Sequence, residues 1–305
     1  MTLNIGTHPN NLATWILSHL PDLQADLERI AGRINWVRYN DGRETAPKLR
    51  EGSIDVGATG STPPIMAQAS GDDIVYIGRS REHPERGGVV VPSHSPIETL
   101  ADLAGRSIAF TVGSWQTHAF AEILARADLD RKDVRVVDIP AVASAQDVID
   151  SGADAWLIHD PLLAAIDEAL GATRIVASVA ELVPNRSVFW ANRAYVASNP
   201  EVVEALIAAL DRAEGWAAAN PERVAELLTT NGRSNSAQKW RDALSHRPWG
   251  VTGVDEVFLR EQQRAAGEQH LRHGDAGGEA LLRAGEEDGD AVFQVEAQPA
   301  GDQPG

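Results

Sequence analysis

The sequence contains no cysteine in its 305 residues, and this absence excludes several kinds of chemistry at once. It rules out disulfides, thiolate metal sites and a cysteine nucleophile, and we expect no lipoprotein anchor. Long apolar runs are also absent, because no stretch approaches the roughly 20 residues that a membrane-spanning helix needs. We therefore expect no insertion into a membrane.

Basic residues are few relative to acidic ones. The chain has 27 lysines and arginines against 44 aspartates and glutamates, for a formal charge of −17. Nucleic acids and anionic membranes attract basic surfaces, so this charge predicts neither as a partner. The sequence opens Met1-Thr2-Leu3-Asn4-Ile5, without the basic and apolar segments of a secretion signal. We expect either a cytoplasmic protein or an extracytoplasmic one whose leader has been removed.

Up to about residue 273, short apolar runs alternate with amphipathic stretches, a pattern typical of α/β architecture. The predicted strands are Leu3–Gly6, Ile34–Tyr39, Asp55–Ala58, Ile74–Ile77, Gly88–Val91, Ser107–Thr111, Val134–Asp138, Ala155–Ile158, Arg174–Ser178 and Val188–Ala191. Helical apolar spacing predicts longer helices over Glu201–Asn220, Pro221–Thr230, Ser236–Ser245 and Asp255–His270.

Two segments, Gly88–Pro92 and Phe189–Arg193, are expected to carry the chain between two lobes. The predicted first lobe holds residues 1–90 and 192–273, and the predicted second lobe holds residues 93–188. Two strands that cross between α/β lobes are typical of a hinge, which lets the lobes close on a ligand. Residues 274–305 are rich in Gly, Ala, Glu, Asp and Gln, and they predict a disordered acidic tail.

Four predicted strands run directly into helices through turns that are rich in hydroxyl and amide side chains. The clearest case is Ala155–Ile158, where Asp160 is expected to cap the helix Leu162–Leu170 and Pro161 to take its first position. The other three turns lie within residues 5–11, 55–64 and 108–117. Helix starts present backbone N–H groups that have no partner in the helix and that can hold an anion. The four turns together predict one anion-binding cleft.

The residues expected to contact the ligand lie in these turns, apart from one arginine. They are His8, Asn10, Asn11, Thr59, Gly60, Ser61, Ser114, Trp115, Gln116, Thr117, His159, Asp160 and Arg247. Hydroxyl, amide and backbone N–H groups from both lobes would donate to the oxygens of the anion. The sequence shows no Asp/Glu–His spacing of the metalloenzyme type, and we expect neither a metal nor a cofactor.

Several of these residues have a second interpretation from the sequence alone. His8, His118 and His159 would face one cleft, either as metal ligands or acid–base groups or, as we favour, as ordinary polar donors. Trp115 either covers an apolar ligand tail or packs between the lobes. Arg247 either reaches the cleft as a cation or is a structural arginine at the surface.

With these features the chain resembles the solute-binding proteins of ABC importers for alkanesulfonates, taurine and nitrate, over about residues 3–270. The resemblance is carried by Glu51–Ala69, Ser95–Phe110, Gly113-Ser114, Asp154–Pro161 and His246-Arg247-Pro248. It implies a two-lobed type II periplasmic binding-protein fold that closes on a small organic anion, most simply an alkanesulfonate. The head group would lie at the turns and the tail would face the second lobe. The implied partner, if the protein is exported, is the permease of the importer.

The departures from that family lie in the wall of the cleft. Relatives often carry aspartate at the position of Ser61, so this chain has one negative charge fewer there. They usually have an aromatic residue at the position of His159 and a tyrosine at that of Leu162. The expected wall is therefore less aromatic and gains an imidazole.

A weaker resemblance, to the aryl sulfinate desulfinases on the same fold, implies an alternative function. It is carried by Leu100–Arg106, Gly113–Trp115 and Gly215-Trp216. Those enzymes use a cysteine after the first strand, where this chain has Thr7-His8-Pro9, so their reaction is excluded. The alternative is a cytoplasmic enzyme that acts on a bound sulfur-containing or carboxylic acid, with His8 and His159, and also His118, as acid–base groups. A cytoplasmic ligand sensor is a third possibility.

Overall fold

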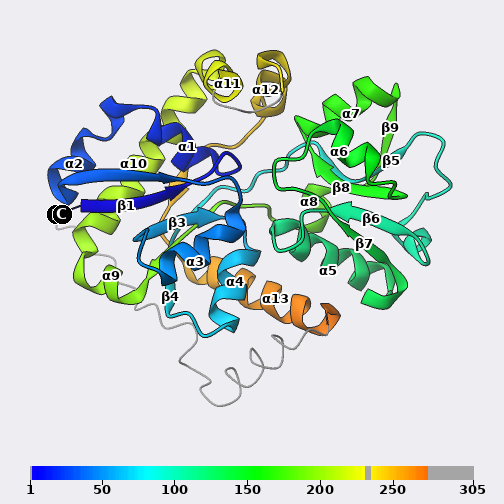
Figure 1. Cartoon of the computed structure of the whole chain (residues 1–305), viewed down its shortest axis with the longest axis horizontal. Coiled ribbons are helices and arrows are strands. Elements are labelled where there is room, and N and C mark those ends of the chain that lie inside the picture. Colours follow the sequence, from blue (N-terminus) through cyan, green and yellow to red (C-terminus); the bar gives the residue numbers. More distant parts are fainter. Residues whose placement is uncertain (1, 231–234, 274–305) are drawn as a thin grey trace, which may run out of the picture.

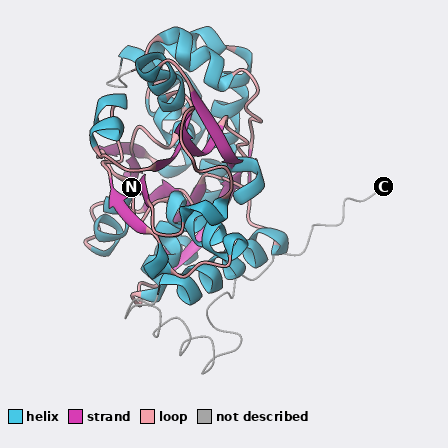
Figure 2. Ribbon diagram, turned by 90° about the vertical axis from the view of Figure 1, so that its right-hand side faces the viewer, coloured by secondary structure: helices cyan, strands magenta, loops and turns pink. Residues whose placement is uncertain are grey.

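The computed structural model describes residues 2–230 and 235–273, and these form two lobes side by side (Figure 1). Each lobe is built on one β-sheet that is covered by helices, as a view turned by 90° also shows (Figure 2). The predicted tail, residues 274–305, lies outside the described residues. Within the described ranges, no helix combines the length and the apolar character needed to cross a bilayer.

The first lobe contains a six-stranded sheet with the strand order β11-β4-β10-β3-β1-β2. Its strands are β1 (Thr2–Thr7), β2 (Arg33–Arg38), β3 (Val56–Thr59), β4 (Ile74–Ser80), β10 (Val188–Asn192) and β11 (Val251–Thr252). β1 runs parallel to β2 and β3, whereas β10 is antiparallel to both β3 and β4. Its helices are α1 (Leu12–Ser18), α2 (Ala25–Ala31), α3 (Thr45–Arg50), α4 (Thr62–Ala69), α9 (Arg193–Ser198), α10 (Pro200–Ala219), α11 (Pro221–Thr230) and α12 (Ala237–Leu244).

The second lobe contains a five-stranded sheet with the strand order β7-β6-β8-β5-β9. Its strands are β5 (Gly87–Pro92), β6 (Ser107–Phe110), β7 (Arg135–Asp138), β8 (Ala155–His159) and β9 (Thr173–Ser178). β6 is parallel to β7 and β8, and β5 is antiparallel to β8 and β9. Its helices are α5 (Trp115–Ala127), α6 (Ala145–Asp150), α7 (Leu162–Leu170) and α8 (Val179–Leu182). The last helix, α13 (Glu256–His273), contacts α4 of the first lobe and α5 of the second.

The apolar runs of inner strands such as β8 and β10 are buried on both faces of their sheet, whereas the outer strands β2, β7 and β9 are only partly buried. In β10, the fully buried Phe189 points into the core beneath α1 and α10, and its neighbour Trp190 points into the opposite core with Phe258 of α13. This alternation follows from the two-residue period of a strand. The ten predicted strands all correspond to observed ones, and only the two-residue β11 was missed.

The chain passes between the lobes at residues 81–86 and 183–187, not in Gly88–Pro92 and Phe189–Arg193 as we expected. The structure corrects that expectation because β5 and β10 are each hydrogen-bonded inside one sheet. A buried apolar run predicts a strand but does not tell which sheet the strand joins. The two connecting segments lie antiparallel: the His83 N–H donates to the Asn185 carbonyl (2.7 Å), and Asn185 Nδ2 donates to Glu85 Oε2 (2.5 Å).

Pro161 is also corrected, because it is the N-cap of α7 and not its first residue. Its carbonyl accepts the Ala165 N–H (3.2 Å), as the carbonyl of an N-cap residue does. Asp160 still caps the helix from one residue further out, since its Oδ1 accepts the Ala164 N–H (3.1 Å).

Candidate functional site

A cleft of about 300 Å³ lies between the two lobes, where β1, β3, β6 and β8 end. β1 and β3 are parallel, and so are β6 and β8, so the turns that follow them gather at the facing edges of the two sheets. Among the predicted contact residues, the cleft is lined by His8, Asn10, Thr59 and Gly60 from the first lobe and by Ser114, Trp115, Gln116, His159 and Asp160 from the second.

Two further candidates, Asn11 and Arg247, line a smaller chamber of about 80 Å³ that adjoins the cleft. Trp115 and His159 belong to the walls of both spaces. Asn11 is the N-cap of α1, and its Oδ1 accepts a backbone N–H in the first turn of that helix. The candidate residues therefore surround one main space and a side chamber.

The remaining candidates, Ser61 and Thr117, do not line the main cleft. Ser61 lies beside Trp115, with its Oγ 3.4 Å from Nδ1 of His118. Thr117 Oγ1 accepts the Gly113 N–H (2.8 Å) and so holds the turn before α5. Thr117 therefore supports a turn and Ser61 contacts the second lobe, and neither side chain forms the wall of the main cleft.

The hydroxyl groups that we expected to donate to an anion already hold the turns in place. Ser114 Oγ donates to the Thr111 carbonyl (2.7 Å) and accepts the Gln116 N–H (3.2 Å) as the cap of α5. Thr59 Oγ1 donates to the Gly60 carbonyl (2.8 Å). A ligand would have to displace these bonds to receive either hydroxyl proton.

Gln116 is likewise part of the scaffold. Its Oε1 accepts the Thr111 N–H (2.8 Å) at the end of β6, and its Nε2 donates to the Leu157 carbonyl (2.8 Å) in β8. The side chain is buried, so these bonds join two neighbouring strand ends in a region shielded from water.

The two helix starts that face each other differ in the backbone donors they offer. α4 begins at Thr62, and the following Pro63 and Pro64 have no N–H. At the start of α5, the Thr117 N–H donates to the Ser114 carbonyl (2.9 Å), but the Trp115 N–H has no acceptor within the described part of the chain. The start of α5 therefore offers the Trp115 N–H to an anion, whereas Pro63 and Pro64 of α4 offer no N–H group.

The three histidines do not form a metal site. His8 is buried, and its Nε2 donates to the Ala58 carbonyl (2.8 Å). His159 donates from Nδ1 to the Asp160 carbonyl (2.7 Å). No group of three or more metal-binding side chains occurs in residues 2–230 and 235–273. These bonds orient the His8 and His159 rings in the cleft wall, whereas His118, which we expected at the same cleft, does not line it, and its Nδ1 lies 3.4 Å from Ser61 Oγ.

Trp115 both lines the cleft and packs between the lobes, which the sequence offered as two alternatives. Its indole lines the cleft and lies 5.6 Å from the His159 ring, measured between ring centroids. It also crosses to the first lobe, where a Cβ added to Gly60 would lie 2.7 Å from the Trp115 Cβ. The absence of a side chain at Gly60 therefore lets the two lobes approach.

Arg247 is a buried member of a charge cluster, which corrects its interpretation as a surface residue. Only 4% of its side chain is exposed. Its Nη1 donates to Glu85 Oε1 (3.1 Å), its Nη2 donates to Nε2 of His83 (2.8 Å), and its Nη2 lies 3.8 Å from Glu214 Oε1. The cluster lies beside the connecting segment 81–86, so Arg247 stabilises the region where the lobes join.

Glu214 is fully buried in this cluster, and burial raises the pKa of its carboxyl to about 6 despite the nearby Arg247. Its Oε2 accepts the Gly250 N–H (2.6 Å). Burial with Arg247 at hand also lowers the pKa of His83 well below its usual value. At neutral pH the cluster thus contains the neutral imidazole of His83 and the carboxyl group of Glu214, whose ionisation is disfavoured by burial.

The raised pKa of Glu214 predicts a pH-dependent stability. The protonated carboxyl is favoured in the folded state, so its contribution is complete below pH 4.5 and is lost as the pH rises through about 6. We expect the unfolding free energy of wild type to fall by about 2 kcal/mol between pH 4.5 and 7.5 because of Glu214. Glu214→Gln should not show this fall. Urea titrations at both pH values measure it. Glu204→Gln, exposed on the same helix, is the control, and equal pH profiles for wild type and Glu214→Gln would contradict the assignment.

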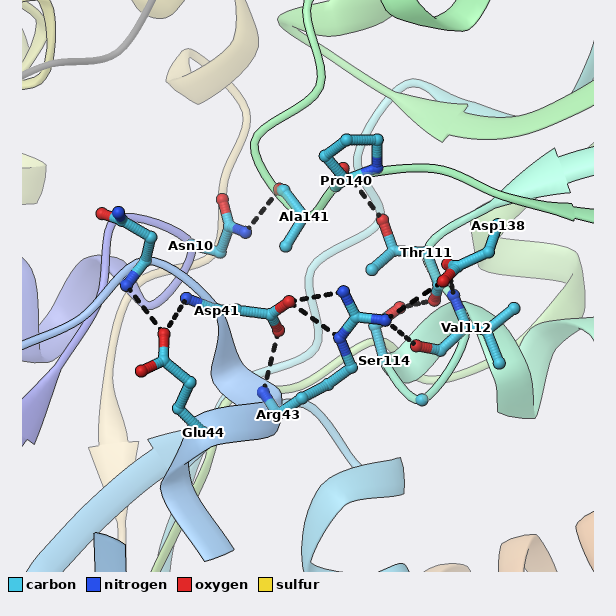
Figure 3. Close-up of polar contacts among 12 residues, drawn as sticks. Asn10, Asp41, Arg43, Glu44, Thr111, Val112, Ser114, Asp138, Pro140 and Ala141 are labelled. Atoms are coloured by element: carbon cyan, nitrogen blue, oxygen red, sulfur yellow. Dashed lines mark hydrogen bonds and ion pairs between the residues drawn. The ribbon is translucent and has the colours of Figure 1, made fainter. Parts of the chain in front are cut away.

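The sequence analysis missed Asp41, Arg43 and Asp138, which lie around one end of the cleft (Figure 3). Asp41 and Arg43 follow β2, and Asp138 ends β7. Both strands were predicted, so the rule applied to the other four strand ends would have found these turns. What the sequence could not give is the contact of Arg43 with the opposite lobe.

With this geometry established, comparisons with known proteins identify the family. The NMT1/THI5-like family model matches residues 33–224, which is more than half of the chain. The chain belongs to the NMT1/THI5-like family. A putative aliphatic sulfonates-binding protein of Escherichia coli K12 is 32% identical to this NMT1/THI5-like protein over 238 residues, which cover 76% of this chain and 73% of that protein.

Solved structures agree with the expected fold. The alkanesulfonate-binding protein SsuA from Xanthomonas axonopodis pv. citri, bound to MOPS, has a TM-score of 0.78 at 26% identity and covers 89% of this chain and 93% of its own. The periplasmic aliphatic sulphonate binding protein SsuA from Escherichia coli also has a TM-score of 0.78, at 25% identity, covering 100% of this chain and 95% of its own. The predicted periplasmic binding-protein fold and the resemblance to the alkanesulfonate-binding family are confirmed.

Proposed function

We propose that this NMT1/THI5-like protein binds an alkanesulfonate between its two lobes and delivers it to an ABC importer. The observation that carries the proposal is the cleft at the facing strand ends, in a chain similar to a putative aliphatic sulfonates-binding protein and to two SsuA structures named for sulfonate binding. The Trp115 N–H at the start of α5 is a suitable donor for a permanently charged head group. The enzyme alternative is not favoured, since the Escherichia coli relative and the two SsuA structures are described as binding proteins.

The tail of the ligand would face the second lobe. Ile139, Pro140, Val142 and Leu162 give that wall of the cleft an apolar surface. Burial of each methylene of an alkane chain contributes about 0.8 kcal/mol, so affinity should rise about fourfold per added carbon until the cleft is filled. This supports an alkanesulfonate over a small inorganic anion such as nitrate.

Calorimetry on the whole chain tests the proposal. We expect methane-, propane- and pentanesulfonate to bind with increasing affinity, and carboxylates of the same length and nitrate to bind more weakly. A panel in which no sulfonate binds would overturn the proposed function. Formation of a new product from any panel member, followed by NMR, would instead support the enzyme alternative.

We further propose an extracytoplasmic location, in line with the periplasmic assignment of the Escherichia coli neighbour, and a permease as protein partner. The liganded, closed form is what such a partner would recognise. Cell fractionation of the native host tests the location. Recovery of the protein only with the cytoplasm would contradict both parts of this proposal and favour a ligand sensor.

A further inference from the structure

Arg43 reaches from the first lobe to the second across one end of the cleft (Figure 3). It lies on a short 3₁₀ turn, Gly42–Glu44, directly before α3. Its Nη1 donates to the Val112 carbonyl (3.1 Å) and lies 3.4 Å from Asp138 Oδ2, and both partners belong to the second lobe. One guanidinium group therefore makes a hydrogen bond and an ion pair between the lobes.

Asp41 holds Arg43 in the conformation that crosses the cleft. Asp41 Oδ1 accepts the Arg43 backbone N–H (2.9 Å), and Oδ2 accepts the Arg43 Nε–H (2.7 Å). Burial would raise the pKa of Asp41, but these bonds to Arg43 lower it overall, so the carboxylate stays charged. Because the guanidinium is already oriented within its own lobe, less side-chain entropy is lost when it meets the second lobe.

The second lobe is shaped to receive this side chain. The Val112 N–H donates to Asp138 Oδ1 (2.9 Å), which fixes the carboxylate and the carbonyl that Arg43 contacts. Gly113 has a φ of +81°, and a Cβ at that position would lie 3.2 Å from Arg43 Cδ. The glycine thus permits both the turn before α5 and the close passage of the arginine.

A second contact from the first lobe holds the same part of the second lobe. Asn10 Nδ2 donates to the Ala141 carbonyl (2.8 Å), three residues after Asp138. The segment between these two attachment points contains Ile139 and Pro140, which line the cleft. The wall that would contact the ligand tail is therefore held to the first lobe from both of its ends.

We propose that Arg43 is a positioning residue that keeps the closed cleft over its ligand, and that it sets how fast the ligand leaves rather than which head group is bound. A contact present only when the lobes are together stabilises the closed state over the open one. Opening must break the Arg43 contacts with Val112 and Asp138 before the ligand can escape. The effect on ligand release rests on the proposed function, whereas the effect on lobe opening does not.

The test compares Arg43→Gln with wild type. The chain has no cysteine, so Glu28→Cys on α2 and Lys132→Cys in the second lobe, both exposed, supply one spin label in each lobe. Without ligand, we expect Arg43→Gln to shift the measured distances toward an open form. With pentanesulfonate, stopped-flow competition should show release about five- to tenfold faster, as expected for one lost hydrogen bond and one part-exposed ion pair.

Arg50→Gln is the matched control, because Arg50 forms a similar pair with Asp72 (2.6 Å) inside the first lobe. Asp138→Asn, which keeps an acceptor for the Val112 N–H, should accelerate release in the same direction as Arg43→Gln and by less. If Arg43→Gln matches Arg50→Gln in both distance and release rate, the proposal is wrong although sulfonates bind. If wild type binds no sulfonate, the proposed function fails, and the distances without ligand still decide the role of Arg43.

Discussion

Replacement of Gly60 by alanine should prevent full closure of the lobes and lower the affinity for a sulfonate. The new Cβ would lie 2.7 Å from the Trp115 Cβ and 3.5 Å from its Cα, so one lobe must move away from the other. Overpacking of this kind costs about 1–3 kcal/mol, which corresponds to an affinity loss of about 5- to 150-fold. Calorimetry with pentanesulfonate measures the loss.

The same substitution should leave the unliganded chain as stable as wild type. Gly60 does not adopt a left-handed conformation, and the clash arises only when the lobes meet. Gly253→Ala is the control, since an added Cβ there meets nothing within 4 Å. If Gly60→Ala binds the sulfonate as tightly as wild type, Trp115 must move aside at little cost. The added Cβ would then not prevent closure, and the prediction would be wrong.

The fold was largely predictable because its signals are local. Each strand from β1 to β10 is a short apolar run, and each of the four turns combines a cap residue with glycine or proline. The errors lie where a local pattern must be given a place in space. The run Gly88–Val91 was correctly predicted as a strand, but nothing in its residues indicates that it pairs with β8 and β9 inside the second sheet.

The sequence indicated that many of the candidate residues gather at one cleft, but not what each polar group bonds. Ser114 and Gln116 line the cleft, yet the Ser114 hydroxyl bonds to the Thr111 carbonyl and the Gln116 N–H, and the Gln116 amide bonds to the backbones of Thr111 and Leu157. A sequence shows that a donor is near a strand end and cannot show whether a carbonyl or a ligand receives its proton. Arg43 was missed for a related reason, because its partners depend on how the two lobes meet.

Arg247 shows the same limit with a larger consequence, because its partners lie far away in the sequence. Glu85 precedes it by 162 residues, and Glu214 belongs to the C-terminal half of α10. The motif His246-Arg247-Pro248 therefore gave no sign of a buried counter-ion. In the structure its guanidinium also lies over the Trp249 ring, with the carbon at its centre 5.0 Å from the ring centroid.

Arg247→Met should therefore destabilise the fold strongly. It removes the cation from two carboxylates of which Glu214 is fully buried and Glu85 is only 14% exposed. Removing one partner of a buried ion pair costs about 3–5 kcal/mol, because the remaining charge stays out of water. Urea unfolding at pH 7.5 measures this loss. Arg241→Met is the control, since its pair with Glu222 is at the surface and should contribute less than about 1 kcal/mol.

The pH dependence of this loss separates a structural role from a ligand-binding one. Glu214 takes up a proton below its pKa of about 6, and its neutral form needs no cation. The cost of Arg247→Met should therefore be smaller at pH 5 than at pH 7.5. If Arg247 served the ligand alone, the variant would unfold like wild type at both pH values and lose only its affinity for the sulfonate. That result would return Arg247 to the binding site and contradict its assignment as the counter-ion of the region between the lobes.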